Sequence, residues 1–115
     1  MNARELTEII KTNHKVIVKF EADWCQPCKD LSILMNNVVS KLNEPVKYLH
    51  VDIENSPELL SHFGIKSVPF VIKYQDGELV DSFIGVRDEG FIESFILADG
   101  KYTVQTDLTS TRKFF

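Results

Sequence analysis

The sequence predicts an α/β protein with a central mixed β-sheet and helices on both faces of that sheet. Helix and strand patterns alternate along most of the 115 residues, without an internal repeat. A long amphipathic helix pattern follows the cysteine pair, and Asp76-Gly77 marks a β-hairpin. A chain of this length is expected to fold as one domain, here residues 1–100.

The first predicted elements are a short helix and a strand. Asn2 and Glu5 have the spacing of a capping box and precede a narrow apolar stripe, so a helix is expected to begin there. Residues 15–21 are rich in β-branched and aromatic side chains, which favours a central strand. Alternation along this strand assigns its side chains to two faces: Val16, Val18 and Phe20 on one, and Ile17, Lys19 and Glu21 on the other.

The middle of the chain predicts a helix, a strand and a short helix. Apolar residues recur with a helical period between 31 and 42, and Pro27 suits a first helical turn, so this helix is expected to begin at about the cysteines. Residues 46–51 form the next strand. Ser56-Pro57-Glu58 opens a short helix that Gly64 can close in a left-handed conformation.

The remaining predicted elements are two hairpin strands and a last helix. The strands, residues 70–74 and 79–84, flank the Asp-Gly turn. The helix begins at Asp88, ends near Gly100 and is expected to bury Phe91, Ile92, Phe95 and Ile96. We expect the order βαβαβαββα, which includes a further strand ahead of the first helix.

Composition and charge restrict the classes of function. A net charge of -4 gives no general attraction for nucleic acid phosphates, and the apolar runs are too short to span a membrane. The first fifteen residues lack the apolar core of a signal peptide, so a cytoplasmic location is expected. Two cysteines cannot form a disulfide scaffold, and in a reducing compartment their bridge is expected to be transient.

The segment from Phe20 to Lys29, FEADWCQPCK, resembles the thioredoxin family, together with Val68-Pro69 and Gly85 further along. By order and spacing of motifs, the resemblance runs from about Arg4 to Leu97. A Cys-x-x-Cys pair alone is a weak signal. Trp-Cys-x-Pro-Cys-Lys at a strand-to-helix junction, followed by Val-Pro, is highly specific. The resemblance implies the thioredoxin fold and a thiol-disulfide oxidoreductase that reduces protein disulfides.

The cysteine spacing has a physical rationale. Cys25 falls at the amino end of a helix, where free N-H groups and the helix dipole favour an anion, so it is expected to be the nucleophile. Cys28, one turn further, can attack the mixed disulfide that Cys25 forms and is expected to resolve it. No cofactor beyond the redox-active Cys25-Cys28 pair is expected, and no metal. The resemblance also implies a thioredoxin-reductase-like electron donor and a monomer.

The residues expected to bind substrate surround the cysteine pair. By resemblance, Pro69 is a cis-proline that leaves the backbone of Val68 free to pair with an extended peptide; an ordinary trans-proline is the alternative. An apolar groove would hold the substrate around the sulfur atoms. Its expected lining is Trp24, Gln26, Pro27, Val68, Gly85 and Val86. Packing of Trp24 in the core is an alternative for that residue.

Two residues depart from the family pattern. Lys19 stands where the family commonly has a buried aspartate beneath the dithiol, and Glu21 replaces a common aromatic residue. Because the two alternate onto one face of a strand, we expect them to pair, with Glu21 as the proton acceptor for Cys28 and Lys19 orienting it. The alternative is a lysine whose ammonium reaches water past the sheet edge.

Three further readings remain open. The fold could be a non-catalytic interaction subunit, or the same cysteines could serve a disulfide oxidase or isomerase of higher potential. The cysteines could also be half of a zinc site completed by His14, His50 or His62, although none has zinc-motif spacing. Residues 101–115 extend beyond the expected domain as a tail for which disorder is the simplest expectation.

Overall fold

The structure is a computed structural model and describes residues 1–99. A four-stranded sheet has the order β2-β1-β3-β4, with β1 parallel to β2 and antiparallel to β3, and β3 antiparallel to β4. The elements in chain order are α1 (Ala3–Thr12), β1 (Lys15–Glu21), α2 (Gln26–Lys41), β2 (Lys47–Asp52), α3 (Glu58–Phe63), β3 (Phe70–Gln75), β4 (Glu78–Ile84) and α4 (Glu89–Leu97). The predicted mixed sheet is therefore confirmed.

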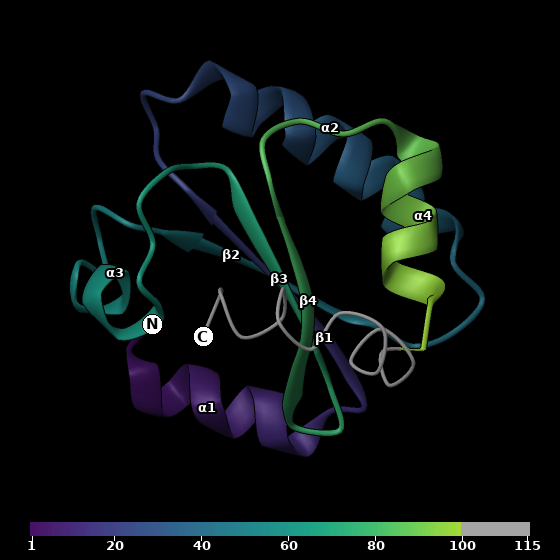
Figure 1. Ribbon diagram of the computed structural model, residues 1–115, viewed down its shortest axis with the longest axis horizontal. Helices are drawn as coiled ribbons and strands as arrows, with labels where there is room; N and C mark the ends of the chain where they lie inside the picture. The colour runs from purple at the N-terminus through teal and green to yellow at the C-terminus, as the bar shows by residue number, and fades with distance from the viewer. Residues whose placement is uncertain (100–115) are drawn as a thin grey trace, which may run out of the picture.

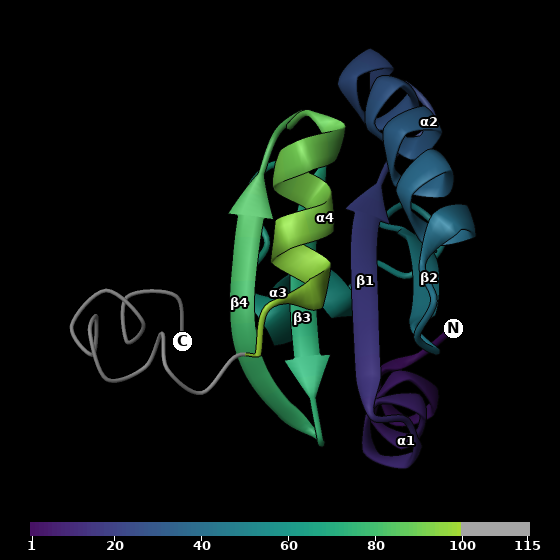
Figure 2. The same ribbon diagram turned by 90° about the vertical axis from the view of Figure 1, so that its right-hand side faces the viewer.

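Helices cover both faces of the sheet, as Figures 1 and 2 show. The α1 and α3 side is packed by one apolar cluster that includes Leu6, Leu59 and the β1 residues Val18 and Phe20. The α2 and α4 side is packed by a second cluster, which takes Ile17 from β1. The predicted alternation along β1 is confirmed, and this strand is the shared middle of both cores.

The local signals also behave as predicted at most helix ends. Asn2 and Glu5 form the capping box of α1, and Gly64 closes α3 at a φ of 64°. The hairpin turn places Asp76 and Gly77 at φ angles of 53° and 84°, the left-handed pair that a type I′ turn requires. Ser56 does not cap α3, because its hydroxyl donates to the carbonyl of Met1 at 2.7 Å.

Two predictions about the elements are wrong. Within residues 1–99 there is no strand ahead of α1, because the chain enters that helix directly from its N-cap, Asn2. Phe91 is 40 % exposed rather than buried, since it lies on the outer side of α4, where its ring contacts Phe83 and the Arg87 guanidinium. Ile92, Phe95 and Ile96 are buried as expected.

The predicted domain end at residue 100 and the tail 101–115 lie outside the described residues. Each helix in residues 1–99 is too short or too polar to cross a membrane.

The sheet face beneath α2 and α4 contains three buried lysines, Lys15, Lys19 and Lys73. Each ammonium has oxygen partners, as a buried charge requires. Lys15 bonds Glu44 and the Leu97 carbonyl, and Lys73 donates to the carbonyls of Phe95 and Ala98. Lys15 and Lys73 thereby satisfy carbonyls at the C-terminal end of α4 that have no partner within the helix.

Burial lowers the pKa of Lys73 to about 8 from its ordinary value of 10.5, and the charge of Lys15 lowers it further. The carboxylates of Asp81, Asp99 and Glu44 act in the opposite direction. Between these two pKa values the unfolded chain binds more protons than the folded protein, so the free energy of unfolding rises with pH. The pKa of Tyr74 is raised by burial to about 12, so its ionisation in the folded protein falls above this window.

We predict that the free energy of unfolding of the disulfide-bonded protein rises by about 1–2 kcal/mol between pH 7.5 and 9.5. Lys73→Met removes the titrating group and should abolish this rise. Denaturant unfolding at both pH values measures it. Lys11→Met, which removes an exposed lysine from α1, is the control and should keep the rise; a rise that survives Lys73→Met would contradict the assignment.

Candidate active site

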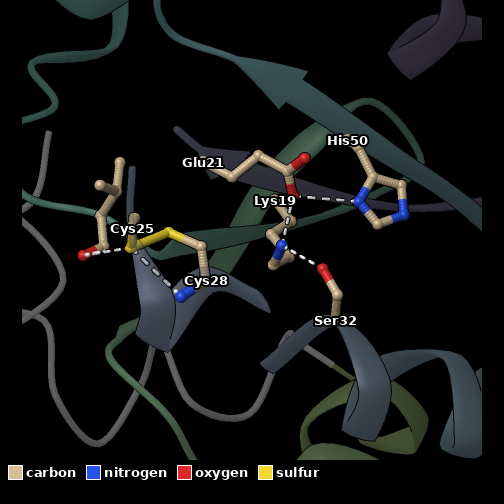
Figure 3. Close-up of polar contacts among 7 residues, drawn as sticks. Lys19, Glu21, Cys25, Cys28, Ser32 and His50 are labelled. Atoms are coloured by element: carbon tan, nitrogen blue, oxygen red, sulfur yellow. Dashed lines mark hydrogen bonds and ion pairs between the residues drawn. A yellow bond between two sulfur atoms is a disulfide. The ribbon is translucent and has the colours of Figure 1, made fainter. Parts of the chain in front are cut away.

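Cys25 and Cys28 lie where β1 gives way to α2, at one end of the sheet (Figure 3). Cys25 has an extended backbone and is the N-cap of α2, with Pro27 in the first turn, as the sequence predicts. The two residues form a disulfide across a Cα–Cα distance of 5.3 Å. Both are buried, at 4 % and 2 % exposure, and pack with Ala22, so little of either residue is open to solvent.

The start of α2 provides a favourable electrostatic environment for one of the two sulfur atoms. The N-H of Cys28 donates to the Sγ of Cys25 at 3.1 Å. Because unpaired N-H groups and the helix dipole concentrate positive potential at this point, a thiolate at Cys25 is stabilised in the reduced protein. The helix gives Cys28 no equivalent position, since it lies one turn further in.

The loop before β3 forms the wall opposite the cysteines. The Val68-Pro69 peptide bond is cis, as the sequence resemblance implies, and the Sγ of Cys25 lies 3.8 Å from the carbonyl oxygen of Val68. Gly85 donates its N-H to the carbonyl of Pro69 at 3.0 Å and has a φ of 87°, a conformation that favours glycine. The C-terminal ends of β1 and β4 and the N-terminal end of β3 thus lie near the Sγ of Cys25.

Exposed apolar side chains belong to the segments that adjoin this junction. Trp24 is 68 % exposed and Val86 44 %, so the alternative of Trp24 as a core residue is wrong. The Trp24 indole N-H donates to Glu54 at 3.2 Å, which holds the ring against the loop after β2. Gln26 and Pro27 are also exposed, and Gln26 bonds Asp30 on the next turn.

Beneath the cysteines, Lys19 and Glu21 form the expected ion pair (Figure 3). Lys19 is fully buried and its ammonium also donates to the Ser32 hydroxyl at 2.6 Å. The alternative of an ammonium that reaches water is therefore wrong, because β1 is an inner strand covered by α2. The same Glu21 oxygen, Oε1, lies 3.1 Å from Nδ1 of His50 on β2.

Two opposing effects set the acidity of Glu21. Burial alone would raise the pKa of its carboxyl, but hydrogen bonds and positive charge from Lys19 and His50 outweigh burial and hold the pKa below its ordinary value of 4.5. Glu21 is therefore a carboxylate at neutral pH. An ionised carboxylate can accept a proton from a neighbouring acid.

A small pocket of about 60 Å³ borders both Glu21 of this ion pair and Cys28. Its walls include Glu21, Cys28 and Ser32, together with Ala22, Asp23 and Lys29. The volume exceeds what one water molecule needs, so the pocket has room for water beside the carboxylate and the cysteine. The structure thereby brings the predicted acceptor and the predicted resolving cysteine to one polar space.

The histidines named as zinc ligands do not join the cysteines. His14 pairs with Asp76, His50 with Glu21, and His62 packs against Phe63. In residues 1–99, the one group of three or more side chains close enough to share an ion is Asp23, Asp52 and Glu54. This group includes neither cysteine, and a zinc site built on the cysteines has no support in it.

Sequence reasoning missed Ser32 and Glu54 of this site, and it named His50 only as a possible zinc ligand. Ser32 follows Cys28 by four residues and so shares its helix face, which was a readable signal. His50 is the register partner of Lys19 across the parallel β1-β2 pair. That register depends on packing of the whole layer, and the sequence pattern does not specify it.

A helix-capping cysteine joined to a second cysteine one turn later, and facing a cis-proline loop, is the site of a thiol-disulfide oxidoreductase. The chain belongs to the thioredoxin family: the family described as Thioredoxin matches residues 1–98. Sequence resemblance, fold and site agree on this assignment.

Individual relatives show how far the similarity extends. The chain is 38 % identical to thioredoxin of Mycoplasmoides gallisepticum over 84 residues, which cover 73 % of this chain and 83 % of that protein. It is 34 % identical to mitochondrial thioredoxin of Bos taurus over 88 residues, 76 % of this chain, but spans only about half (53 %) of that protein. Oxidised mitochondrial thioredoxin 3 of Saccharomyces cerevisiae superposes with a TM-score of 0.75 at 26 % identity, covering 83 % and 88 % of the two chains.

The Lys19-Glu21 pair predicts an asymmetric effect on stability. Lys19→Met replaces a buried ion by an apolar side chain and should change the free energy of unfolding by less than about 1 kcal/mol, whereas Glu21→Ala leaves the buried ammonium without its counter-charge and should cost about 3 kcal/mol. Denaturant unfolding of both variants and of the double variant measures this.

The double variant is the control for that comparison. If Glu21→Ala destabilises the protein because Lys19 is left charged, adding Lys19→Met should restore most of the lost free energy. Equal losses that simply add in the double variant would show that the two side chains do not interact.

Proposed function

We propose that this protein reduces disulfide bonds in protein substrates by exchanging them with the Cys25-Cys28 pair. The observation that carries the proposal is the position of Cys25, which caps a helix beside the Val68 carbonyl. The exposed apolar side chains of the adjoining segments, Trp24, Pro27 and Val86, are called the rim below. A helix N-terminus favours the attacking thiolate, and an apolar rim suits a polypeptide substrate.

The exchange proceeds in two balanced steps. The Cys25 thiolate attacks one sulfur of the substrate disulfide, a Cys25-substrate S-S bond forms, and the other substrate sulfur leaves as a thiolate. Cys28 then loses its proton and attacks the Sγ of Cys25, which forms the Cys25-Cys28 bond and releases the second substrate sulfur. The dithiol loses two electrons and the substrate gains them.

Glu21 is the acceptor that we assign to the Cys28 proton. It is a carboxylate whose pKa is held low, and it shares the small pocket with Cys28, which permits transfer through one water. Lys19 orients Glu21 by bonding Oε1 and leaves Oε2 outside that bond. This arrangement supplies the role that an aspartate at position 19 would otherwise have.

Substrate docking is assigned to the rim. An extended peptide would pair with the backbone of Val68, and its side chains would lie against apolar surface. The residues that we assign to this contact are Trp24, Gln26, Pro27, Val68, Pro69, Gly85 and Val86. At Gly85 an added Cβ would meet no protein atom within 4 Å, so the space above it is open to a bound chain.

The working context of the protein follows from the same chemistry. Reduced Cys25 and Cys28 must be regenerated by two electrons and two protons, for which we propose a thioredoxin-reductase-like donor and a role in electron transport. We place the protein in the cytoplasm, because thiols there are kept reduced. We propose that it acts as a monomer, because the working pair uses both cysteines and leaves none for a bridge between chains. We propose no cofactor beyond this disulfide. Nucleic acid and membrane are not proposed as partners, given the net charge of -4.

The cysteine roles are tested with single serine variants. Cys25→Ser should abolish reduction of a protein disulfide such as those of insulin, because no nucleophile remains. In the Cys28→Ser variant, Cys25 should still attack the substrate disulfide, but the reaction should stop at the mixed disulfide. Mass spectrometry of the intact complex detects this species. In the reduced native protein, iodoacetamide should modify Cys25 first; equal rates at both thiols would contradict the assigned roles.

Docking on the rim is tested with Val86→Asp. A charge on the exposed apolar surface should reduce kcat/KM for a protein disulfide by about tenfold, equivalent to about 1.4 kcal/mol, and should leave the reaction with a small aromatic disulfide unchanged. Leu97→Asp is the matched control, since Leu97 is similarly exposed at 41 % but its carbonyl bonds Lys15 at the opposite end of β1. Similar losses in both variants would argue against the rim.

A further inference from the structure

The polar network beneath the dithiol does not end at Glu21. Oε1 of Glu21 lies 3.1 Å from Nδ1 of His50, and the His50 side chain is 40 % exposed, compared with 28 % for Glu21 and none for Lys19. Figure 3 shows the imidazole on the side of Glu21 away from Cys28. The network thus extends from the pocket that borders Cys28 to a side chain that reaches water.

The two faces of Glu21 have different partners. Toward α2, the carboxylate borders the pocket that it shares with Cys28 and Ser32. Toward β2, it meets His50, whose ring is packed against the Tyr48 ring at a centroid separation of 4.5 Å. A proton that enters Glu21 from the pocket therefore has an exit on the opposite side, and the Tyr48 contact keeps that exit in place.

We propose that His50 is a positioning residue for this reaction, which acts through Glu21 by accepting the proton that Cys28 releases and passing it to solvent. The inference rests on the proposed role of Glu21 as acceptor. Histidine suits the task because, once Glu21 holds the proton from Cys28, an imidazole with its proton on Nε2 can accept that proton at Nδ1 and release its own from the opposite side of the ring. The net change is the transfer of one proton from Cys28 to solvent; Glu21 returns to its carboxylate, and proton exchange with solvent restores the starting tautomer of His50 for the next cycle.

Other charged and titratable groups face this network from every element packed against it. Lys19 comes from β1, Tyr48 and Asp52 from β2, Cys28 and Lys29 from α2, and Asp23 from the turn before α2. Burial raises the pKa of Tyr48, and the charge of Glu21 raises it further, so Tyr48 keeps its proton through the neutral range.

The second step can be followed alone with an excess of dithiobis(nitrobenzoate). Attack by Cys25 releases one coloured thiolate, and attack by Cys28 on the mixed disulfide releases another at a rate independent of reagent concentration. The leaving group needs no proton, so the pH dependence of this phase reports the deprotonation of Cys28. In the native protein we expect the pH profile of this phase to include a step that requires His50.

The test variant is His50→Gln, whose amide can still donate to Glu21 but cannot take up a proton. We expect the second phase to be about tenfold slower at neutral pH and to lose that step from its pH profile, a smaller effect than the hundredfold or more of a direct general base. His62→Gln, at an exposed histidine of α3, should keep the native rate and profile. Added imidazole should restore the rate of His50→Gly, which a purely structural role would not allow.

Comparison with Glu21→Gln separates the possible failures. A slow second phase in Glu21→Gln with a native profile in His50→Gln would overturn the role of His50 and leave the role of Glu21 intact. A slow phase in His50→Gln with a native rate in Glu21→Gln would overturn transfer through Glu21. Reduction of a protein disulfide by the native protein, and its loss in Cys25→Ser, tests the proposed function itself, independently of both.

Discussion

The structure depends on the position of β1 as an inner strand that is buried on both faces. Val18 and Phe20 of β1 pack beneath α1 and α3, while Ile17 and Lys19 lie beneath α2 and α4. The strand ends at Glu21, four residues before the cysteine that caps α2. Because the strand is fixed from both sides, the turn that follows it and the start of α2 are fixed as well, and the sulfur atoms are held against the Val68 loop.

Placing a lysine in such a strand has consequences for the whole layer. A fully buried ammonium needs compensating groups, and Lys19 obtains them from Glu21 on its own strand and from Ser32 on α2. The ion pair with Lys19 holds the Glu21 carboxylate in the space beneath Cys28. There, burial raises the pKa of Glu21 and its hydrogen bonds lower it. The buried lysine at position 19 is therefore accompanied by a carboxylate, a hydroxyl and, beyond the carboxylate, an imidazole.

The same face shows how the chain satisfies its other buried lysines. Lys15 and Lys73 direct their ammonium groups at carbonyls near the end of α4 and so connect the sheet to that helix at the end opposite the cysteines. One end of this face thus holds the hydrogen bonds of Lys15 and Lys73 to α4, and the other end holds the Cys25-Cys28 pair. Between the two ends, Ile17, Val71 and the α2 residues supply the apolar packing that holds both helices on the sheet.

The sequence by itself determined the elements that local chemistry controls. The Asn2 capping box, the Asp76-Gly77 hairpin, the helix start at Cys25 and the alternation along β1 all depend on a few neighbouring residues, and they appear as predicted. Lys19 and Glu21 could be paired in advance because two residues on one strand must share a face. The tertiary structure alone decided that His50 meets Glu21, that Glu54 holds Trp24 and that Phe91 faces outward. These contacts depend on the register of β2 against β1 and on how each helix is rotated on the sheet, and both are set by packing of the entire layer rather than by any local pattern.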